Sequence, residues 1–176
     1  MHSIHNQSNK MKIRRKLWDM FAVGFSGSQR GMSKPQIEGT VQTLLCLRKY
    51  GKDSLEFHHG KCVGSDVRAG KLARKFGYSV IVHPASDLPA EKIADCPYDE
   101  QWDEAPHKVR NTDIVENTDV LIATPYAEED DAVSKYSGTW QTIRIARKLN
   151  KPIIIIYRDG RRICENKAKA FLTKPQ

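Results

Sequence analysis

Small and hydroxyl-bearing residues follow several short apolar runs of this chain, and arginines stand close to two of these segments. Backbone amides and hydroxyls of such residues donate hydrogen bonds to phosphate oxygens, and a nearby guanidinium can neutralise the phosphate charge. The segments read "SGSQRGMSKPQ" from Ser26, "HGKCVGSD" from His59, "RNTDIVENTD" from Arg110 and "SGTWQT" from Ser137. The candidate ligand-binding residues are Ser26, Gly27, Ser28, Arg30, Gly60, Gly64, Asp66, Arg110, Asn111, Ser137, Gly138, Thr139, Gln141 and Thr142.

Residues that begin helices recur in the same segments. Ser33, with Gln36 three residues later, has the spacing of a capping box. Asn111 is expected to cap a helix that has Asp113 in its first turn, which would leave Arg110 just outside that helix. Every helix needs a cap, so no single one of these signals indicates a ligand. The functional interpretation depends on several helix starts meeting at one edge of a sheet.

Five short apolar runs alternate with segments of helical period. Strands are expected at 21–25, 54–59, 78–82, 119–124 and 152–157. Between them, apolar side chains recur at the three- and four-residue spacing of amphipathic helices, as in Ala69, Leu72, Ala73 and Phe76. Strands that are apolar on both faces predict a parallel sheet with helices on both faces. The sequence therefore predicts one Rossmann-like α/β domain with about five strands.

The expected fold brings the candidate residues together. In an open α/β sheet, ligands bind at the carboxyl ends of the strands, where helix N-termini supply unpaired amides and partial positive charge. The candidate residues either follow a predicted strand or begin a predicted helix at that edge. We therefore expect the binding site there.

Two acidic stretches, 85–107 and 126–136, interrupt the alternation of strands and helices. We expect both to be long loops. Loops of this length in a compact domain act as lids or binding elements, but the same composition is also typical of disorder. The sequence leaves both interpretations open.

The formal net charge of +8 is concentrated near the start of the chain. Five of the basic residues lie within residues 10–16, so about three charges (8 − 5) remain for the rest of the 176 residues. We expect residues 1–18 to form a flexible basic tail and residues 19–176 to form the folded domain. The tail offers a weak nucleic-acid contact, although such segments are more often only solvated.

Composition excludes several other classes. No apolar run approaches the roughly 20 residues that a membrane helix needs, and no signal peptide is visible, so we expect a cytoplasmic protein without a membrane partner. The four cysteines are widely scattered and are expected to be reduced thiols. His58, His59, Cys62 and His83 have metal-binding chemistry, but adjacent histidines on a strand point to opposite faces, so no metal site is expected. Trp140 either stacks on a base or packs against a loop or a partner subunit.

Four segments, in this order, resemble the SLOG superfamily. They are "GFSGSQRGM", "HGKCVGSDVRAGKLA", "RNTDIVENTDVLIA" and "SGTWQTIRIARKLNKPIIII", and they cover most of residues 21–157. The second is similar to "SGxAxGIDxxAH" of the DNA-processing protein A family, and the last two resemble its "RNRIIAGLS" and "SGSLxTAxxA" stretches. The superfamily also includes the "lonely guy" phosphoribohydrolases and sensors of NAD-derived signals. The resemblance implies a Rossmann-like fold, a nucleotide-type ligand without a further cofactor, and a homo-oligomer.

The catalytic carboxylate of the phosphoribohydrolases is missing from this chain. Those enzymes carry "PGGxGTxxE", and aligning its Gly-Thr pair with Gly138 and Thr139 puts Thr142 at the glutamate position. Cleavage of an N-glycosidic bond passes through an oxocarbenium-like state that such a carboxylate stabilises. The leading hypothesis is therefore a protein that binds, and by binding sequesters, a nucleotide or a nucleotide-derived signal.

Two alternatives stay open. An N-glycosidic-bond hydrolase could use another acid, namely Asp66, Asp113 or a glutamate within 126–136. Single-stranded DNA binding, as in the DNA-processing family, could use the basic tail together with the arginines within 158–162. The sequence does not decide whether the protein is an enzyme.

Overall fold

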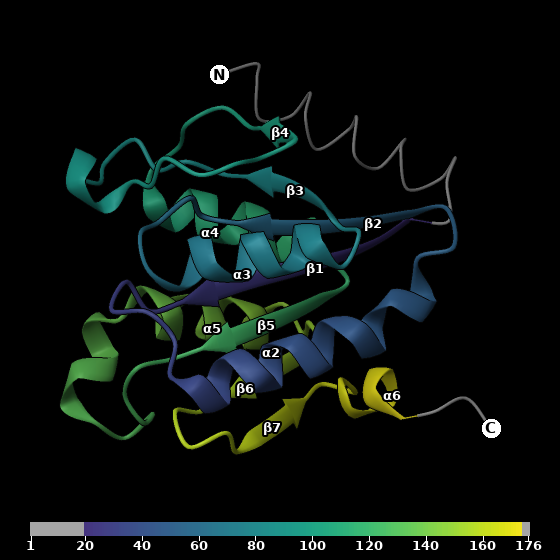
Figure 1. Cartoon of the computed structure of the whole chain (residues 1–176). Coiled ribbons are helices and arrows are strands. Elements are labelled where there is room, and N and C mark those ends of the chain that lie inside the picture. Colours follow the sequence, from purple (N-terminus) through teal and green to yellow (C-terminus); the bar gives the residue numbers. More distant parts are fainter. Residues whose placement is uncertain (1–19, 174–176) are drawn as a thin grey trace.

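Seven strands form one sheet in the order β4-β3-β2-β1-β5-β6-β7 (Figure 1). The computed structural model describes residues 20–173, so the basic tail expected at residues 1–18 lies outside the described residues. Neighbouring strands are parallel except for β7, which is antiparallel to β6. The strands are β1 (Met20–Gly27), β2 (Ser54–His59), β3 (Ser79–Val82), β4 (Glu100–Gln101), β5 (Val120–Thr124), β6 (Ile153–Ile156) and β7 (Arg162–Glu165).

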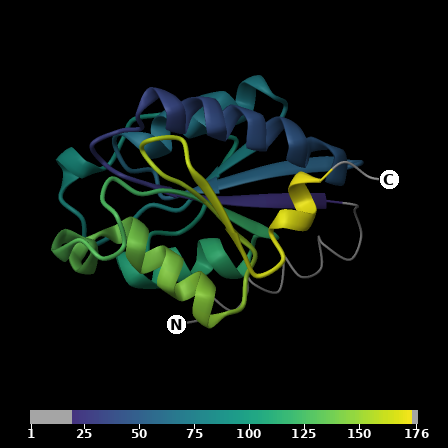
Figure 2. The same cartoon turned by 90° about the horizontal axis from the view of Figure 1, so that it is seen from below.

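Helices cover both faces of the sheet. Helices α2 and α3 lie on one face, and α4 and α5 lie on the other (Figures 1 and 2). The α-helices are α2 (Lys34–Leu47), α3 (Ser65–Lys75), α4 (His107–Glu116), α5 (Gly138–Lys148) and the short α6 (Lys169–Leu172). The predicted α/β class and the two helical layers are confirmed, and the sheet is parallel as predicted except for β7. Within residues 20–173, none of the helices combines the length and apolar character that crossing a membrane requires.

The prediction of about five strands was too low, because the sheet has an additional strand at each edge. Strand β4 has only two residues, which is too short to form a recognisable apolar run. Strand β7 reads Arg-Ile-Cys-Glu, and its residues are exposed or half-buried because it is an edge strand. Antiparallel neighbours need only a short connection, and β7 follows β6 directly without a helix between them.

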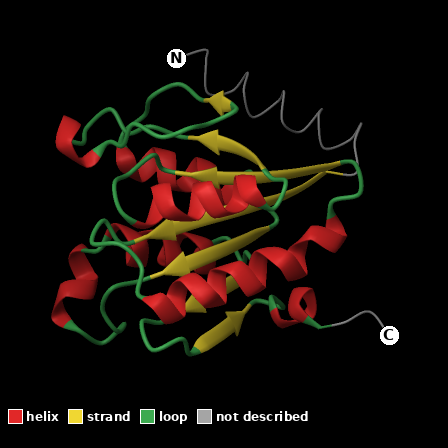
Figure 3. Cartoon of the chain, in the orientation of Figure 1, coloured by secondary structure: helices red, strands yellow, loops and turns green. Residues whose placement is uncertain are grey.

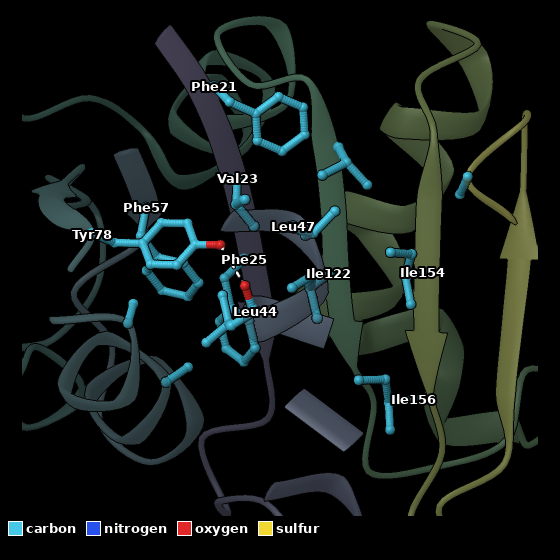
Figure 4. Packing of buried hydrophobic residues seen from close by; sticks show 14 residues of the cluster. Phe21, Val23, Phe25, Leu44, Leu47, Phe57, Tyr78, Ile122, Ile154 and Ile156 are labelled. Carbon is cyan, nitrogen blue, oxygen red and sulfur yellow. Dashed lines mark hydrogen bonds between the residues drawn. The ribbon is translucent and has the colours of Figure 1, made fainter. Parts of the chain in front are cut away.

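Two hydrophobic clusters hold the helices against the sheet, one on each face. The four isoleucines of β6 are all fully buried, because Ile154 and Ile156 enter one cluster while Ile153 and Ile155 enter the other. Burial of one such side chain stabilises the fold by roughly 1.5–3 kcal/mol. Figure 4 shows the first cluster, in which the hydroxyl of Tyr78 donates a hydrogen bond of 2.7 Å to the main-chain carbonyl of Leu44.

Both acidic stretches have defined structure. The stretch 85–107 contains the 3-10 helix η2 (Ala90–Lys92) and β4, and it pairs with the segment after β2 through a bridge between Cys62 and Ile93. The stretch 126–136 contains the 3-10 helix η3 (Ala132–Tyr136). Both stretches lie on the side toward which the arrows of β1, β2, β3 and β5 point (Figure 3). They therefore belong to the edge at which the sequence predicts a site.

Candidate functional site

A pocket of about 870 Å³ lies at the carboxyl ends of the strands. Ligand pockets of proteins typically measure about 300–1,000 Å³, so the volume suits a nucleotide-sized molecule. Eleven of the fourteen candidate residues line it, namely Ser26, Gly27, Ser28, Arg30, Gly60, Asp66, Arg110, Asn111, Ser137, Gly138 and Thr139. The remaining three, Gly64, Gln141 and Thr142, do not.

The end of β1 forms part of the pocket wall and leaves no room for a side chain. Gly27 is the last residue of β1, and a Cβ atom there would collide with the side chains of Ser65 and Thr124. Directly after it, the carbonyl of Ser28 accepts hydrogen bonds from the amide and the hydroxyl of Ser65, at 3.0 and 2.7 Å. The loop after β1 is therefore fastened to the start of α3.

Helix α5 begins in the pocket with unpaired amides. Ser137 is its N-cap, and the Ser137 hydroxyl accepts a hydrogen bond from the amide of Trp140. The amides of Gly138 and Thr139 precede the first intrahelical hydrogen bond and donate to no acceptor within residues 20–173. A Cβ atom on Gly138 would have no neighbouring atom within 4 Å, so the space beside these amides is open. An anion placed there would also interact favourably with the helix dipole.

The other helix starts are capped by groups of the protein itself. Ser33 and Gln36 form the predicted capping box of α2. The first amide of α3, from Ser65, donates to the carbonyl of Ser28, and the first amide of α4, from His107, donates to the carboxylate of Asp87 at 2.7 Å. In α5, the two residues with unpaired amides, Gly138 and Thr139, both line the pocket, and the space beside Gly138 is open.

Arg110 and Asn111 lie inside α4, and the prediction that Asn111 caps this helix was wrong. The helix begins at His107 and has Pro106 as its N-cap, so Arg110 and Asn111 belong to its second turn. The sequence signal failed because the start of α4 uses a side chain from 20 residues earlier, the carboxylate of Asp87. Both residues line the pocket from this helix.

The guanidinium of Arg110 is buried at the pocket wall without a carboxylate partner. Its side chain donates hydrogen bonds to the main-chain carbonyls of Gly60 and His83, the latter at 2.9 Å, and contacts the Cys62 sulfur at 3.7 Å. Arg110 is only 5% exposed, and its Nε atom has no hydrogen-bond partner. Among the described residues, no carboxylate lies within ion-pair distance of it. A buried charge is normally paired, so this arginine is suited to an anion from outside the protein.

Asp66 organises the loop after β2. Its carboxylate accepts hydrogen bonds from the amides of Gly60 and Cys62, at 3.0 and 3.2 Å. Gly60 has no side chain because a Cβ atom at this position would collide with the guanidinium of Arg110. Asp66 also lines the pocket, and its Oδ2 atom is the one that accepts both backbone hydrogen bonds.

The three candidate residues outside the pocket wall have structural contacts. Gly64 has a positive φ of 85°, and a Cβ atom there would collide with the backbone of Gln29. Gln141 accepts a hydrogen bond of 3.2 Å from the Asn111 side chain and so links α5 to α4. Thr142 is 1% exposed, and its hydroxyl donates to the carbonyl of Gly138 at 2.9 Å.

A tyrosine stands between two arginines at the pocket. The guanidinium carbon of Arg30 lies 4.6 Å from the centre of the Tyr126 ring, and that of Arg158 lies 4.5 Å from it. Cations at this distance from an aromatic face are attracted by its quadrupole. Arg30 and Tyr126 line the pocket, so two positive charges stand near it beside the one at Arg110.

Several pocket residues were not predicted from the sequence. They come mostly from the two acidic stretches and include Leu88, Lys92, His107, Tyr126, Glu128, Asp131, Val133 and Tyr136. The length and composition of these stretches were a signal for a lid or binding element, but they did not indicate which residues would face a ligand. Each carboxylate that these stretches contribute to the pocket wall has a partner, since Glu128 pairs with Arg161 at 2.8 Å and Asp131 accepts from the Val133 amide.

Trp140 and the histidines occupy positions inside the fold. Trp140 is fully buried, and its indole N–H donates to the carbonyl of Ala127 at 3.0 Å, so of the two predicted roles the structure favours packing against a loop. His58 and His59 point to opposite faces of β2, where His58 lies 2.9 Å from a ring nitrogen of His83. Burial and the neighbouring His58 hold the pKa of His83 well below its ordinary value. In the described part of the chain, no cluster of three potential ligands could hold a metal ion.

Cys62 is a buried thiol at the pocket wall. Burial, with a smaller contribution from Asp66, raises the pKa of its thiol above the ordinary value. A thiol with a raised pKa is mostly protonated at neutral pH and is a poor nucleophile. The structure therefore supports a structural role for this residue.

The arrangement of parallel strands, two helical layers and a pocket at the carboxyl edge defines a Rossmann-like α/β protein. No protein-family model matches the chain, and no curated protein matches it significantly. Solved structures do match. The chain is similar to the molybdenum cofactor binding protein of Rippkaea orientalis, with a TM-score of 0.58, 19% identity and coverage of 78% of this chain and 77% of that one.

Two further structures share the fold. For the molybdenum cofactor carrier protein of Chlamydomonas reinhardtii, the TM-score is 0.53 at 15% identity, covering 77% of this chain and 76% of that one. For DNA processing protein A of Streptococcus pneumoniae, the TM-score is 0.56 at 18% identity, and the match covers 77% of this chain but only 50% of that one. At these identities the likeness concerns the fold alone. These matches confirm the Rossmann-like fold that the resemblance to the SLOG superfamily implied.

Proposed function

We propose that this protein binds a small phosphate-bearing metabolite of the nucleotide or nucleotide-derived class and holds it without cleaving it. The observation that carries this proposal is the buried guanidinium of Arg110, which lines the same pocket as the unpaired amides of Gly138 and Thr139. The guanidinium supplies a positive charge to this pocket, and the two amides supply hydrogen-bond donors. A backbone cradle of this kind recognises phosphate irrespective of the rest of the ligand.

Fold relatives support a small-molecule ligand. Two of the similar structures are a molybdenum cofactor binding protein and a molybdenum cofactor carrier protein, that is, proteins that hold a small molecule. The proposal takes from them only the mode of action, binding without conversion. The molybdenum cofactor and nucleotides therefore both belong to the ligands to be tested.

Hydrolysis is the less favoured function, because the glutamate of the phosphoribohydrolase motif is replaced by Thr142 and the carboxylates at the pocket come from other positions. In the described part of the chain, the carboxylates that line the pocket are those of Asp66, Glu128 and Asp131, and each has a partner within the protein. Thr142, at the position of the missing glutamate, has a neutral hydroxyl that is bonded to the carbonyl of Gly138. Loss of a positioned catalytic group of this kind typically lowers the rate by orders of magnitude.

Native mass spectrometry of freshly purified protein, followed by denaturation and identification of the released molecule, is the most direct test. A phosphorylated heterocycle is the expected result. In addition, adenosine 5′-monophosphate (AMP) at 100 times its Kd should raise the free energy of unfolding by about 2.7 kcal/mol. Failure of AMP, NAD and inorganic phosphate to change the melting temperature would contradict the proposal. The same mass spectra test the predicted homo-oligomer.

Single-stranded DNA binding is the second candidate function. The dependence of affinity on salt concentration distinguishes it from binding of a small metabolite. Arg30 and Arg158, which flank Tyr126, offer an exposed cationic and aromatic surface of the type that binds single strands. If oligonucleotides are the ligand, affinity should fall steeply with salt concentration, and removal of residues 1–16 should reduce that slope. Affinity for AMP together with indifference to oligonucleotides would exclude this candidate.

A further inference from the structure

Within residues 20–173, four aromatic or imidazole rings line the pocket, and three of them are engaged by the protein. Phe25 is fully buried and packs on Phe57, with 5.6 Å between ring centres. The imidazole of His107 pairs with the carboxylate of Asp87 at 2.7 Å. The Tyr126 ring has two guanidinium groups within 4.6 Å of its centre. The rings of Phe25 and Tyr126 thus have other groups packed against them, and the His107 imidazole is tied to Asp87 through its Nδ1 atom.

Tyr136 is the fourth ring and the only one of these four that is free. It is 92% exposed, although it lines the pocket. Neither its ring nor its hydroxyl has a hydrogen bond, a ring contact or a cation contact with another described residue. An aromatic side chain of this size is rarely left so exposed, because about 150–250 Å² of it can be buried on contact. Val133, on the same 3-10 helix and also at the pocket, is 57% exposed.

The position of Tyr136 is set by the start of α5. Ser137, the next residue, caps this helix, and Gly138 and Thr139 follow with their unpaired amides. Two residues of extended chain span at most about 7 Å. The ring therefore stands within the length of one nucleotide from the amides to which we assign the phosphate. The chain between Tyr136 and the start of α5 has a fixed direction, because the Ser137 amide donates a hydrogen bond of 3.2 Å to the carbonyl of Ser134.

From this juxtaposition we propose that the ring of Tyr136 stacks on the planar heterocycle of the ligand and selects nucleotides over sugar phosphates that lack a base. The inference rests on the proposed function and specifies its ligand class. The amides of α5 and Arg110 bind the phosphate, which nucleotides and sugar phosphates have in common. Tyr136 supplies the interaction that only a ligand with a π-face can make. Stacking tolerates different bases, so the residue recognises a heterocycle rather than one particular base.

Isothermal titration calorimetry with two probes, AMP and ribose 5-phosphate, tests the inference. The wild-type protein should bind AMP more tightly than ribose 5-phosphate. Tyr136→Ala should weaken AMP binding about five- to hundredfold, the range measured for loss of one base–aromatic stack, and leave the affinity for ribose 5-phosphate unchanged. Tyr136→Trp should retain or improve AMP binding, because it keeps the aromatic face. The side chain is exposed, so each variant should keep the wild-type melting temperature.

Tyr98→Ala is the matched control, because Tyr98 is a half-exposed tyrosine outside the pocket that lies against Lys61. It should leave both affinities unchanged. The inference is overturned if Tyr136→Ala lowers both affinities equally or neither of them. It is also overturned if the variant changes the molecular mass in solution and not the preference for AMP, since the ring would then belong to a contact with a second copy. Binding of neither probe by the wild type would refute the proposed function itself.

Discussion

The Nη1 atom of Arg110 lies 2.9 Å from the carbonyl oxygen of His83, so a cation of helix α4 is fixed to the end of strand β3. The same guanidinium is one cause of the lowered pKa of His83, which keeps that histidine neutral beside it. A neutral His83 adds no positive charge next to Arg110. The charge at the pocket wall is therefore held rigidly, at no further electrostatic cost, in the position where we place the phosphate.

Replacement of Arg110 should affect ligand binding and stability together. Arg110→Ala removes the buried cation and should weaken AMP binding by tenfold or more, since hydrogen bonds to charged groups contribute about 1.5–3 kcal/mol. It also leaves the carbonyls of Gly60 and His83 without this donor, which should lower the free energy of unfolding by about 1–3 kcal/mol. Calorimetry and urea unfolding measure the two effects. Arg74→Ala, at an exposed pair with Asp99, is the control and should leave AMP affinity unchanged.

A carboxylate introduced at the start of α5 should weaken AMP binding without destabilising the fold. Gly138→Asp introduces a side chain where no atom lies within 4 Å, and a negative charge at a helix N-terminus stabilises the helix by about 0.3–1 kcal/mol. The folded protein should therefore be as stable as the wild type. The new carboxylate would occupy the phosphate site and repel the phosphate group of AMP, so AMP affinity should fall at least tenfold. Lys34→Asp makes the same change at the first residue of α2, outside the pocket, and should have no such effect.

Restoring the glutamate of the phosphoribohydrolase motif should not create an enzyme. Thr142 is 1% exposed, and its hydroxyl also accepts a hydrogen bond of 3.2 Å from Ser26. Thr142→Glu places a larger, charged group in this buried position and should lower the free energy of unfolding by several kcal/mol. Thr142→Ser, which keeps the hydroxyl, should be much better tolerated. Chromatography should detect no adenine released from AMP by the wild type or by either variant, and steady release by the wild type would refute binding without cleavage.

Asp113 should make the fold less stable at neutral than at acidic pH. Desolvation, with a smaller effect of Glu116, raises the pKa of this half-buried carboxyl from 3.8 to about 6. The folded chain then binds a proton more readily than the unfolded chain, so this group's contribution to stability increases as the pH falls from 7 toward 4. Asp113→Asn should therefore raise the free energy of unfolding at pH 7 by about 1–2 kcal/mol after solvent screening, and by almost nothing at pH 4.

Denaturant unfolding of both proteins at pH 4, 5, 6 and 7 measures this difference. His83 acts in the opposite direction, since its lowered pKa costs stability as the pH falls below about 6.5. That effect is common to the wild type and the variant and cancels when they are compared at one pH. A difference between them that does not depend on pH would show that the Asp113 carboxyl is not perturbed.

The sequence by itself determined the class of fold and the edge at which the site lies. Both follow from short-range chemistry. Apolar runs such as Ile153–Ile156 must be buried on both faces, and parallel strands joined by helices put all their carboxyl ends on one side. The capping box of Ser33 and Gln36, next to the helix that it starts, was equally visible. For this reason most of the candidate residues line one pocket.

Only the tertiary structure decided what each of these residues does. Asp87 caps α4 from 20 residues away, the backbone of Gln29 fills the space beside Gly64, and Arg110 lies within a helix rather than before it. The free ring of Tyr136 could be recognised only after the other rings at the pocket had been assigned their partners. These outcomes depend on contacts between residues distant in sequence, and local propensity carries no information about such contacts because it reflects only neighbouring residues.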